Sequence, residues 1–282
     1  MFNIDYSINL KNGKVDGEES PFFRAIINEF KPNRGFELIS HSDTEYGSGL
    51  GSSSTMMVSI VGAFKKWLNI NMGEYETAEL AYKIEREDLK IAGGMQDQYA
   101  AVFGGFNYIE FKKNNVIVNR MRIKDEIVNE LQFRLILVNL NVRRRSHAII
   151  QKQIRNLSNE EILDHYNALK EIAREIKDRI YHGDFGDFGE LLKNEWKHKK
   201  NLSPGITNKE IDDFFEFCEK NGALGYKLLG AGGGGYALLF TDEFHRHDLI
   251  KSLKEKDFET SNVEFVNSGL GVWEIDESKR VY

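Results

Sequence analysis

The stretch Gly47-Ser-Gly-Leu-Gly-Ser-Ser-Ser-Thr55 stands directly ahead of a long, mostly apolar run. Its glycines permit left-handed backbone angles, and the run from Ser53 to Leu68 predicts a buried helix. A glycine loop that opens a helix brings several backbone amides to the positive end of the helix dipole. The stretch therefore predicts an anion site, and phosphate is the natural occupant.

Two common phosphate-binding motifs do not match this loop. A Walker A loop requires Lys-Ser or Lys-Thr after the glycines, and none follows here. The dinucleotide fingerprint requires a third glycine where Ser52 stands. From the loop alone, a plain Gly/Ser turn is an equally good interpretation.

Two acidic residues twelve positions apart follow the loop. Glu85 lies near the end of a helix predicted over Glu74–Asp88, and Asp97 lies in a second glycine-rich turn, Gly93-Gly-Met-Gln-Asp. Phosphoryl transfer needs Mg²⁺ with oxygen ligands and a group that accepts or orients the proton of the attacking hydroxyl. The pair can divide these tasks, although a surface salt bridge is the commoner role for a residue such as Glu85.

A third glycine-rich segment, Gly230-Ala-Gly-Gly-Gly-Gly235, formally satisfies the pattern of a dinucleotide-binding loop. It leads into Ala237-Leu-Leu-Phe, which predicts a strand, whereas a dinucleotide site requires the start of a helix. We therefore reject the dinucleotide interpretation. Apolar flanks on both sides also fit a flexible linker poorly.

Together these segments resemble the galactokinase, homoserine kinase, mevalonate kinase and phosphomevalonate kinase (GHMP) superfamily. Gly49-Leu-Gly-Ser-Ser resembles its second motif, and Lys227-Leu-Leu-Gly-Ala-Gly-Gly-Gly-Gly resembles its third. Within it, Gln96-Asp-Gln-Tyr-Ala-Ala-Val-Phe-Gly-Gly and Gly222-Ala-Leu-Gly-Tyr-Lys are most similar to bacterial D-glycero-D-manno-heptose phosphate kinases. One departure is Glu45, where the family usually has proline.

The resemblance implies a two-domain α+β fold. It implies an ATP-binding domain of the ribosomal S5 domain 2-like type over residues 1–125 and a ferredoxin-like domain over residues 126–282. The activity it implies is transfer of the ATP γ-phosphoryl group to the anomeric hydroxyl of D-glycero-D-manno-heptose 7-phosphate. A kinase for another sugar, such as fucose or galactose, and a catalytically weak or silent nucleotide-binding homologue are the alternatives.

The resemblance also assigns roles to residues. It implies Asp97 as the catalytic residue, Ser53 and Glu85 as magnesium ligands, and ATP and Mg²⁺ as cofactors. Phosphate-binding residues are expected at Gly47, Ser48, Gly49, Leu50, Gly51, Ser52, Ser53, Ser54, Gly232, Gly233 and Gly234, and sugar-phosphate contacts at Gln96, Arg145 and Lys227. Lys197, Lys199 and Lys200 either hold a sugar phosphate as well or form a solvated basic face.

The resemblance implies that members of the superfamily begin ~60 residues before the position that corresponds to Met1, a length equal to part of a domain. That segment contains a strand and a glycine-rich loop that faces the sugar. We therefore expect a shortened enzyme, or one completed by a homodimer or by a separate chain that supplies the missing segment.

Composition limits the other partners. The formal charge is −6, from 38 basic and 44 acidic side chains, which disfavours nucleic acid as a partner. A single cysteine, Cys218, excludes an intramolecular disulfide and suits a reducing cytoplasm. No apolar run reaches the ~18 residues that a membrane-spanning helix needs, so we expect no membrane association.

Periodicity and capping residues predict the remaining elements. Capping boxes at Ser158 with Glu161 and at Thr207 with Glu210 each predict the start of a helix, and residues 244–254 form a third amphipathic segment. The predicted strands are residues 36–40, 107–111, 116–118, 133–140, 238–240, 263–265 and 272–275.

Overall fold

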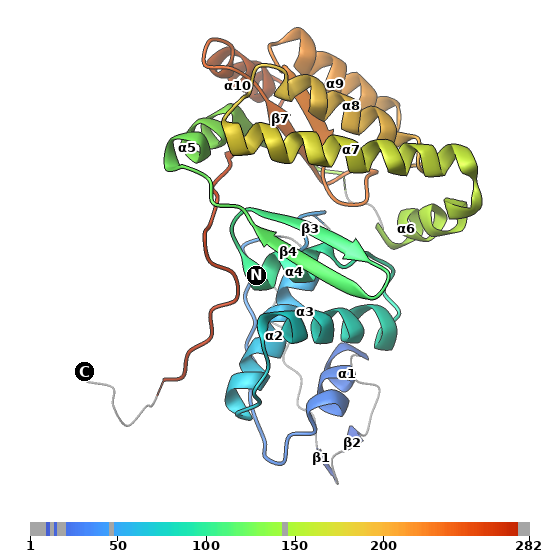
Figure 1. Ribbon diagram of the computed structural model, residues 1–282, viewed down its shortest axis with the longest axis vertical. Coiled ribbons are helices and arrows are strands. Elements are labelled where there is room, and N and C mark those ends of the chain that lie inside the picture. The colour runs from blue at the N-terminus through green and yellow to red at the C-terminus, as the bar shows by residue number, and fades with distance from the viewer. Residues whose placement is uncertain (1–9, 12–13, 16–20, 45–47, 143–145, 276–282) are drawn as a thin grey trace. The chain divides into compact units, whose positions relative to one another are not determined.

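The computed structural model describes residues 10–11, 14–15, 21–44, 48–142 and 146–275. Over these residues the chain divides into two compact units that are discontinuous in sequence (Figure 1). Unit 1 comprises residues 1–43, 53–104 and 268–282, and unit 2 comprises residues 44–52 and 105–267. This division into compact units does not test the boundary between family domains that we expect near residue 125, which stays a prediction.

Unit 1 is mainly helical. Besides the short strands β1 (Leu10–Lys11) and β2 (Lys14–Val15), it holds α1 (Pro21–Phe30), α2 (Ser52–Trp67), α3 (Glu74–Tyr82), the π-helix η1 (Lys83–Asp88) and α4 (Gln96–Phe103). The predicted buried helix is α2, and Met57, Val61 and Phe64 on it are almost completely buried. The helix predicted over residues 74–88 is also confirmed, with a π-helical second half.

One strand predicted in unit 1 is wrong. Residues 36–40 form no strand, and Phe36 instead packs its ring against Phe64 at 5.0 Å and against Trp67 at 5.5 Å between ring centroids. An aromatic side chain that anchors a loop on a helix gives the same apolar signal as a short strand, which explains the error.

Unit 2 contains two antiparallel sheets. Strands β3 (Asn107–Lys112) and β4 (Asn115–Arg120) confirm the strands predicted over residues 107–111 and 116–118, and the structure pairs them as an antiparallel hairpin (Figure 1). The larger sheet has the order β6-β7-β5-β8, formed by β6 (Gly225–Leu228), β7 (Tyr236–Phe240), β5 (Leu135–Asn139) and β8 (Glu259–Asn262). In its centre Leu137 pairs with Leu238 on one side and with Ser261 on the other.

Helices of unit 2 bury the larger sheet. They are α5 (Asp125–Arg134), α6 (Ser146–Arg155), the 3₁₀ turn η2 (Asn156–Ser158), α7 (Glu160–His182), α8 (Phe188–Lys200), α9 (Lys209–Lys220) and α10 (Arg246–Glu255). Val138 of the central strand shares one apolar core with Trp196 of α8, Phe215 of α9 and Leu249 of α10. The chain thus has the expected α+β composition.

The two predicted capping boxes are each displaced by one residue. The N-cap of α7 is Asn159, whose side chain accepts from the Glu161 amide at 2.9 Å, and that of α9 is Asn208, which accepts from the Ile211 amide at 2.9 Å. An asparagine in this position satisfies the same free amide as a serine or threonine would, so the helices start one residue later than predicted.

The last predicted strands are wrong as well. The strand that completes the sheet is β8 (Glu259–Asn262), which ends directly before residue 263, while residues 263–265 and 272–275 form no strand. The strand predicted over residues 133–140 is confirmed only in its second part, because Phe133 and Arg134 end α5.

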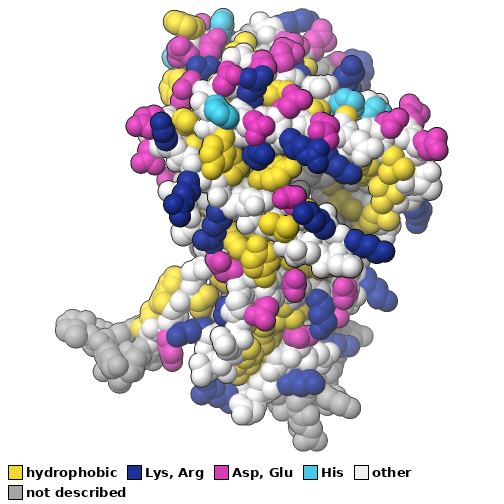
Figure 2. All heavy atoms as spheres, in the orientation of Figure 1, with side chains coloured by type: hydrophobic (Ala, Val, Ile, Leu, Met, Phe, Trp, Pro, Cys, Tyr) yellow, Lys and Arg dark blue, Asp and Glu magenta, His cyan; other side chains and the backbone are white. Residues whose placement is uncertain are grey.

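Charge is mixed on the surface. On the face that Figure 2 shows, basic and acidic side chains are interspersed rather than segregated. None of the helices in the described part of the chain is long and apolar enough to cross a bilayer.

Candidate active site

The first glycine loop lies in unit 2 and runs directly into α2. Gly49 and Gly51 have φ of +82° and +75°, a backbone region that favours glycine. The Ser48 hydroxyl accepts from the Leu50 amide at 3.4 Å and so folds the loop on itself. The loop therefore presents its backbone at the N-terminus of a helix, as predicted, while Gly47 lies outside the described residues.

The first and third glycine loops are in backbone contact within unit 2. A Cβ on Gly230 would lie 2.8 Å from the Gly49 Cα, and a Cβ on Gly235 would lie 2.3 Å from the Ser48 carbonyl oxygen. No side chain fits in either place. The structure thus brings together two loops that are about 180 residues apart in sequence, a separation well beyond any local structural element.

The third loop is also held from its other side. The Gly233 amide donates to the Ile206 carbonyl at 2.7 Å. A Cβ on Gly232 would lie 2.7 Å from the Ile206 side chain, and one on Gly234 would lie 2.4 Å from the Val142 carbonyl oxygen. The loop is a packed element with fixed positive φ angles, which rules out the flexible-linker interpretation.

In unit 1, Glu85 is surrounded by hydrogen-bond donors. Its side chain is 2% exposed. Oε1 accepts from the Ser53 hydroxyl at 2.8 Å, and Oε2 accepts from the Ser54 hydroxyl at 2.7 Å and from the Gln98 amide at 2.7 Å. Ser53 and Ser54 lie in the first turn of α2, so Glu85 ties π-helix η1 to the helix that the glycine loop opens. The surface salt bridge that we weighed for Glu85 is excluded by its burial.

Asp97 lies in the first turn of α4, directly after the turn Ile91–Met95, an irregular segment that bends at Met95. Burial raises the pKa of its carboxyl group, against the lowering effects of the Gln96 hydrogen bond at 3.4 Å and of the Arg86 charge, while Glu85 raises it further. A carboxylate with a raised pKa is a better proton acceptor than an ordinary surface aspartate.

The oxygen atoms near the start of α2 are of the kind that bind magnesium. Among the described residues no group of three or more histidine, cysteine, aspartate or glutamate side chains is arranged so that it could hold a metal ion by itself. Mg²⁺ prefers oxygen ligands and usually binds through one or two carboxylates, waters and substrate phosphates. The Ser53 hydroxyl and the Glu85 carboxylate are therefore a fitting partial ligand set for an ion that a nucleotide also holds.

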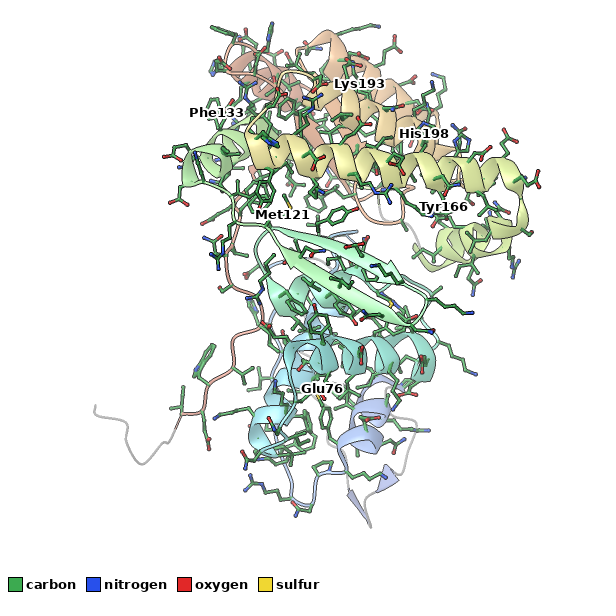
Figure 3. All side chains as sticks on the ribbon, in the orientation of Figure 1. Glu76, Met121, Phe133, Tyr166, Lys193 and His198 are labelled. Carbon is green, nitrogen blue, oxygen red and sulfur yellow. The ribbon has the colours of Figure 1, made fainter. Side chains whose placement is uncertain are left out.

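Three of the basic residues predicted for the sugar phosphate, Lys199, Lys200 and Lys227, already have partners in the structure. The Lys227 ammonium group bonds to Glu195 at 2.7 Å. Lys199, on the same helix as the Lys193 and His198 labelled in Figure 3, donates to the Leu228 carbonyl at 2.7 Å. Burial chiefly, with the nearby Lys227 charge, lowers the pKa of Lys199 to about 8, against the effect of Glu195.

Lys199 therefore links α8 to β6 through a hydrogen bond and does not belong to a solvated basic face. Its neighbour Lys200 lies 4.0 Å from Asp212. Arg145 lies outside the described residues.

We call Glu85 and the side chains that contact it, Ser53, Ser54, Arg86 and Gln98, the Glu85 cluster. Two of its members, Gln98 and Arg86, were not predicted from the sequence. Gln98 donates to both Glu85 and Ser54, and Arg86 contacts the same two residues. Each stands next to a residue that was predicted for the site, Gln98 beside Asp97 and Arg86 beside Glu85. The sequence places each of them next to a predicted site residue. It does not show which neighbouring side chains point toward Glu85.

The chain is similar to known proteins over most of its length. Residues 21–105 match the model of the GHMP kinases N terminal domain, and residues 168–258 match that of the GHMP kinases C terminal domain. The D-glycero-alpha-D-manno-heptose 7-phosphate kinase of Campylobacter jejuni is 40% identical over 265 residues, which cover 94% of this chain and 78% of that protein.

Solved structures show the same relationship. A sugar kinase from Campylobacter jejuni superposes with a TM-score of 0.71 at 36% identity, covering 92% of this chain and 76% of that one. A D-glycero-D-manno-heptose 1-phosphate kinase from Bacteroides thetaiotaomicron superposes with a TM-score of 0.73 at 30% identity, covering 94% and 78%.

Proposed function

The chain belongs to the GHMP kinase family, and from that membership we propose that it phosphorylates the anomeric hydroxyl of D-glycero-D-manno-heptose 7-phosphate. It is an ATP-dependent phosphotransferase with an alcohol group as acceptor, a sugar kinase. The observation that carries the choice of sugar is the 40% identity to a heptose 7-phosphate kinase over almost the whole chain. The product would serve as the precursor of a nucleotide-activated heptose.

We assign the triphosphate to the backbone amides at the N-terminus of α2. The loop residues Ser48–Ser52 and the first-turn residues Ser53 and Ser54 support this role, because small residues let the backbone approach the phosphates. Gly232, Gly233 and Gly234 of the third loop belong to the same proposal, since that loop packs on the first. Their fixed conformation requires little reorganisation when the anion binds.

Ser53 and Glu85 would hold the magnesium ion that accompanies ATP. Bound there, Mg²⁺ would neutralise negative charge on the phosphates. The hydrogen bonds from Ser54 and Gln98 to the Glu85 carboxylate support this role, because they fix the orientation of a group that would otherwise rotate.

Asp97 is proposed to accept the proton of the sugar hydroxyl. The hydroxyl oxygen forms a bond to the γ-phosphorus while the bond from that phosphorus to the bridging oxygen breaks and releases ADP. Gln96, exposed beside Asp97, is proposed to contact the sugar, and Arg145 and Lys227 its phosphate. For Lys227 this requires that the ammonium exchange its present partner, Glu195.

The experiment is an ADP-release assay on the purified chain with Mg-ATP and a panel of acceptors. The panel contains the heptose 7-phosphate, fucose, galactose and mevalonate, which represent substrates named for relatives of the chain. We expect turnover with the heptose phosphate, and none with Asp97→Asn, although that variant still binds Mg-ATP because the substitution leaves the phosphate loops intact. Turnover only with another acceptor would contradict the proposed sugar, and wild-type turnover by Asp97→Asn would contradict its role.

A further inference from the structure

Arg86 connects three segments of unit 1. Its side chain is 10% exposed. In η1, Nη1 lies 3.2 Å from Oε1 of the adjacent Glu85, and in α2 the Ser54 hydroxyl accepts from Nη2 at 3.2 Å. In the turn before Asp97, Nε donates to the Gly94 carbonyl at 3.3 Å and Nη1 to the Ile91 carbonyl at 3.4 Å.

The guanidinium group also lies flat against the turn. A Cβ on Gly93 would lie 2.3 Å from the Arg86 Cζ and 2.6 Å from Nη2. A side chain at position 93 would therefore push the guanidinium away. The φ of Gly93 lies outside the left-handed region that favours glycine, so the demand for glycine here comes from this contact.

Only arginine provides this set of contacts. A planar guanidinium carries donors on three nitrogens in a rigid fork, and here each nitrogen reaches a different acceptor or pair of acceptors. A lysine ammonium is a point charge at the end of a flexible chain. It can pair with Glu85 but cannot span from there to Gly94.

We propose that Arg86 is a positioning residue that fixes the turn Ile91–Met95, and with it Asp97, relative to the Glu85 cluster. The assignment rests on the proposed function for the role of Asp97. It goes beyond that function because it names the side chain that sets where the aspartate stands. A charge that only balances Glu85 would need no contact with the turn, so the two carbonyl contacts distinguish the roles.

Three variants test the proposal. Arg86→Lys keeps the charge and loses the fork, and Gly93→Ala keeps the arginine but displaces it. Arg174→Lys on α7, which removes an exposed guanidinium paired with Glu171, is the matched control. Amide hydrogen exchange of residues 91–97 reports the turn directly and needs no activity.

We expect exchange in residues 91–97 to be about 10-fold faster or more in Arg86→Lys and in Gly93→Ala, and unchanged in Arg174→Lys. We further expect kcat to fall about 10²-fold in both, because a small displacement of a catalytic group has this effect, with little change in the KM for ATP. Unchanged exchange, or wild-type kcat in Arg86→Lys with a loosened turn, would overturn the proposal. Absence of sugar-dependent turnover in the wild type would instead overturn the proposed function, and the exchange data would still decide whether Arg86 fixes the turn.

Discussion

At the scale of single residues, burial decides what the charged groups of this kinase do. Glu85 is enclosed by hydroxyl and amide donors, Asp97 has its pKa raised by burial, and Lys199 has its pKa lowered. The same side chains on an exposed helix would be interchangeable surface charges. Their environment, rather than their type, gives each a distinct role.

Lys199 provides a pH test of this view. Its pKa falls to about 8 in the folded chain, against 10.5 for an unperturbed lysine, so the unfolded chain binds more protons between these values. Stability from this group therefore rises as pH increases through that window, by about 1–3 kcal/mol. We predict that the stability of the wild type relative to Lys199→Met rises between pH 8 and about pH 10, measured by urea unfolding.

The control for this measurement is Lys220→Met, which removes an exposed lysine paired with Glu216 on α9. The wild type and this variant should keep a constant difference in stability over the same pH range. A constant difference between the wild type and Lys199→Met would show that burial does not perturb this amine.

Residue types in the site were predictable, but their partners were not. Resemblance placed Ser53, Glu85 and Asp97, because each stands in a recognisable motif. Arg86 and Gln98 were missed, since their contacts depend on the π-helical turn of η1 and on the entry of α4, which no apolar pattern encodes.

At the scale of elements, long periodic segments were predicted well and polar or short ones were not. The α2 helix and the individual strands β3 and β4 follow from the apolar pattern, whereas the pairing of the two strands was not predicted. Strand β8, Glu259-Thr-Ser-Asn262, carries no apolar alternation, and among the described strands it pairs with β5 alone, at the edge of the sheet. Its register is fixed by the neighbouring strand, information that the local sequence does not contain.

The contact between the two glycine loops yields a prediction at this scale. Gly235→Ala places a methyl group 2.3 Å from the Ser48 carbonyl, so the loops must separate. We expect ATP affinity to fall about 10-fold or more, because the phosphate-binding backbone loses its fixed position, in addition to a loss of about 1–3 kcal/mol of stability. Calorimetric titration with Mg-ATP measures the first effect.

Gly205→Ala is the matched control. Gly205 has a similar φ, +91° against +87° at Gly235, but an added Cβ there meets no atom within 4 Å. Both variants carry the strain of a positive φ, whereas only Gly235→Ala creates the clash. Equal ATP affinities for the two variants would show that the loop contact has no part in nucleotide binding.

At the scale of the whole molecule, the family fold accounts for the distribution of the motifs along the chain. The first loop continues directly into α2, whose first turn meets Glu85, while the third loop comes from the far end of the chain to pack on the first. Within unit 2 the two glycine loops thus meet, and within unit 1 Glu85 meets the first turn of α2. This juxtaposition is long-range, so the sequence predicted it only through resemblance to a family.

The most direct test of the account is a crystal structure of the chain with Mg²⁺ and a non-hydrolysable ATP analogue. We predict that backbone amides of Ser52–Ser54 bind the phosphate oxygens and that the metal ion lies beside Ser53 and Glu85. A nucleotide bound elsewhere, with the start of α2 unliganded at saturating analogue, would contradict it.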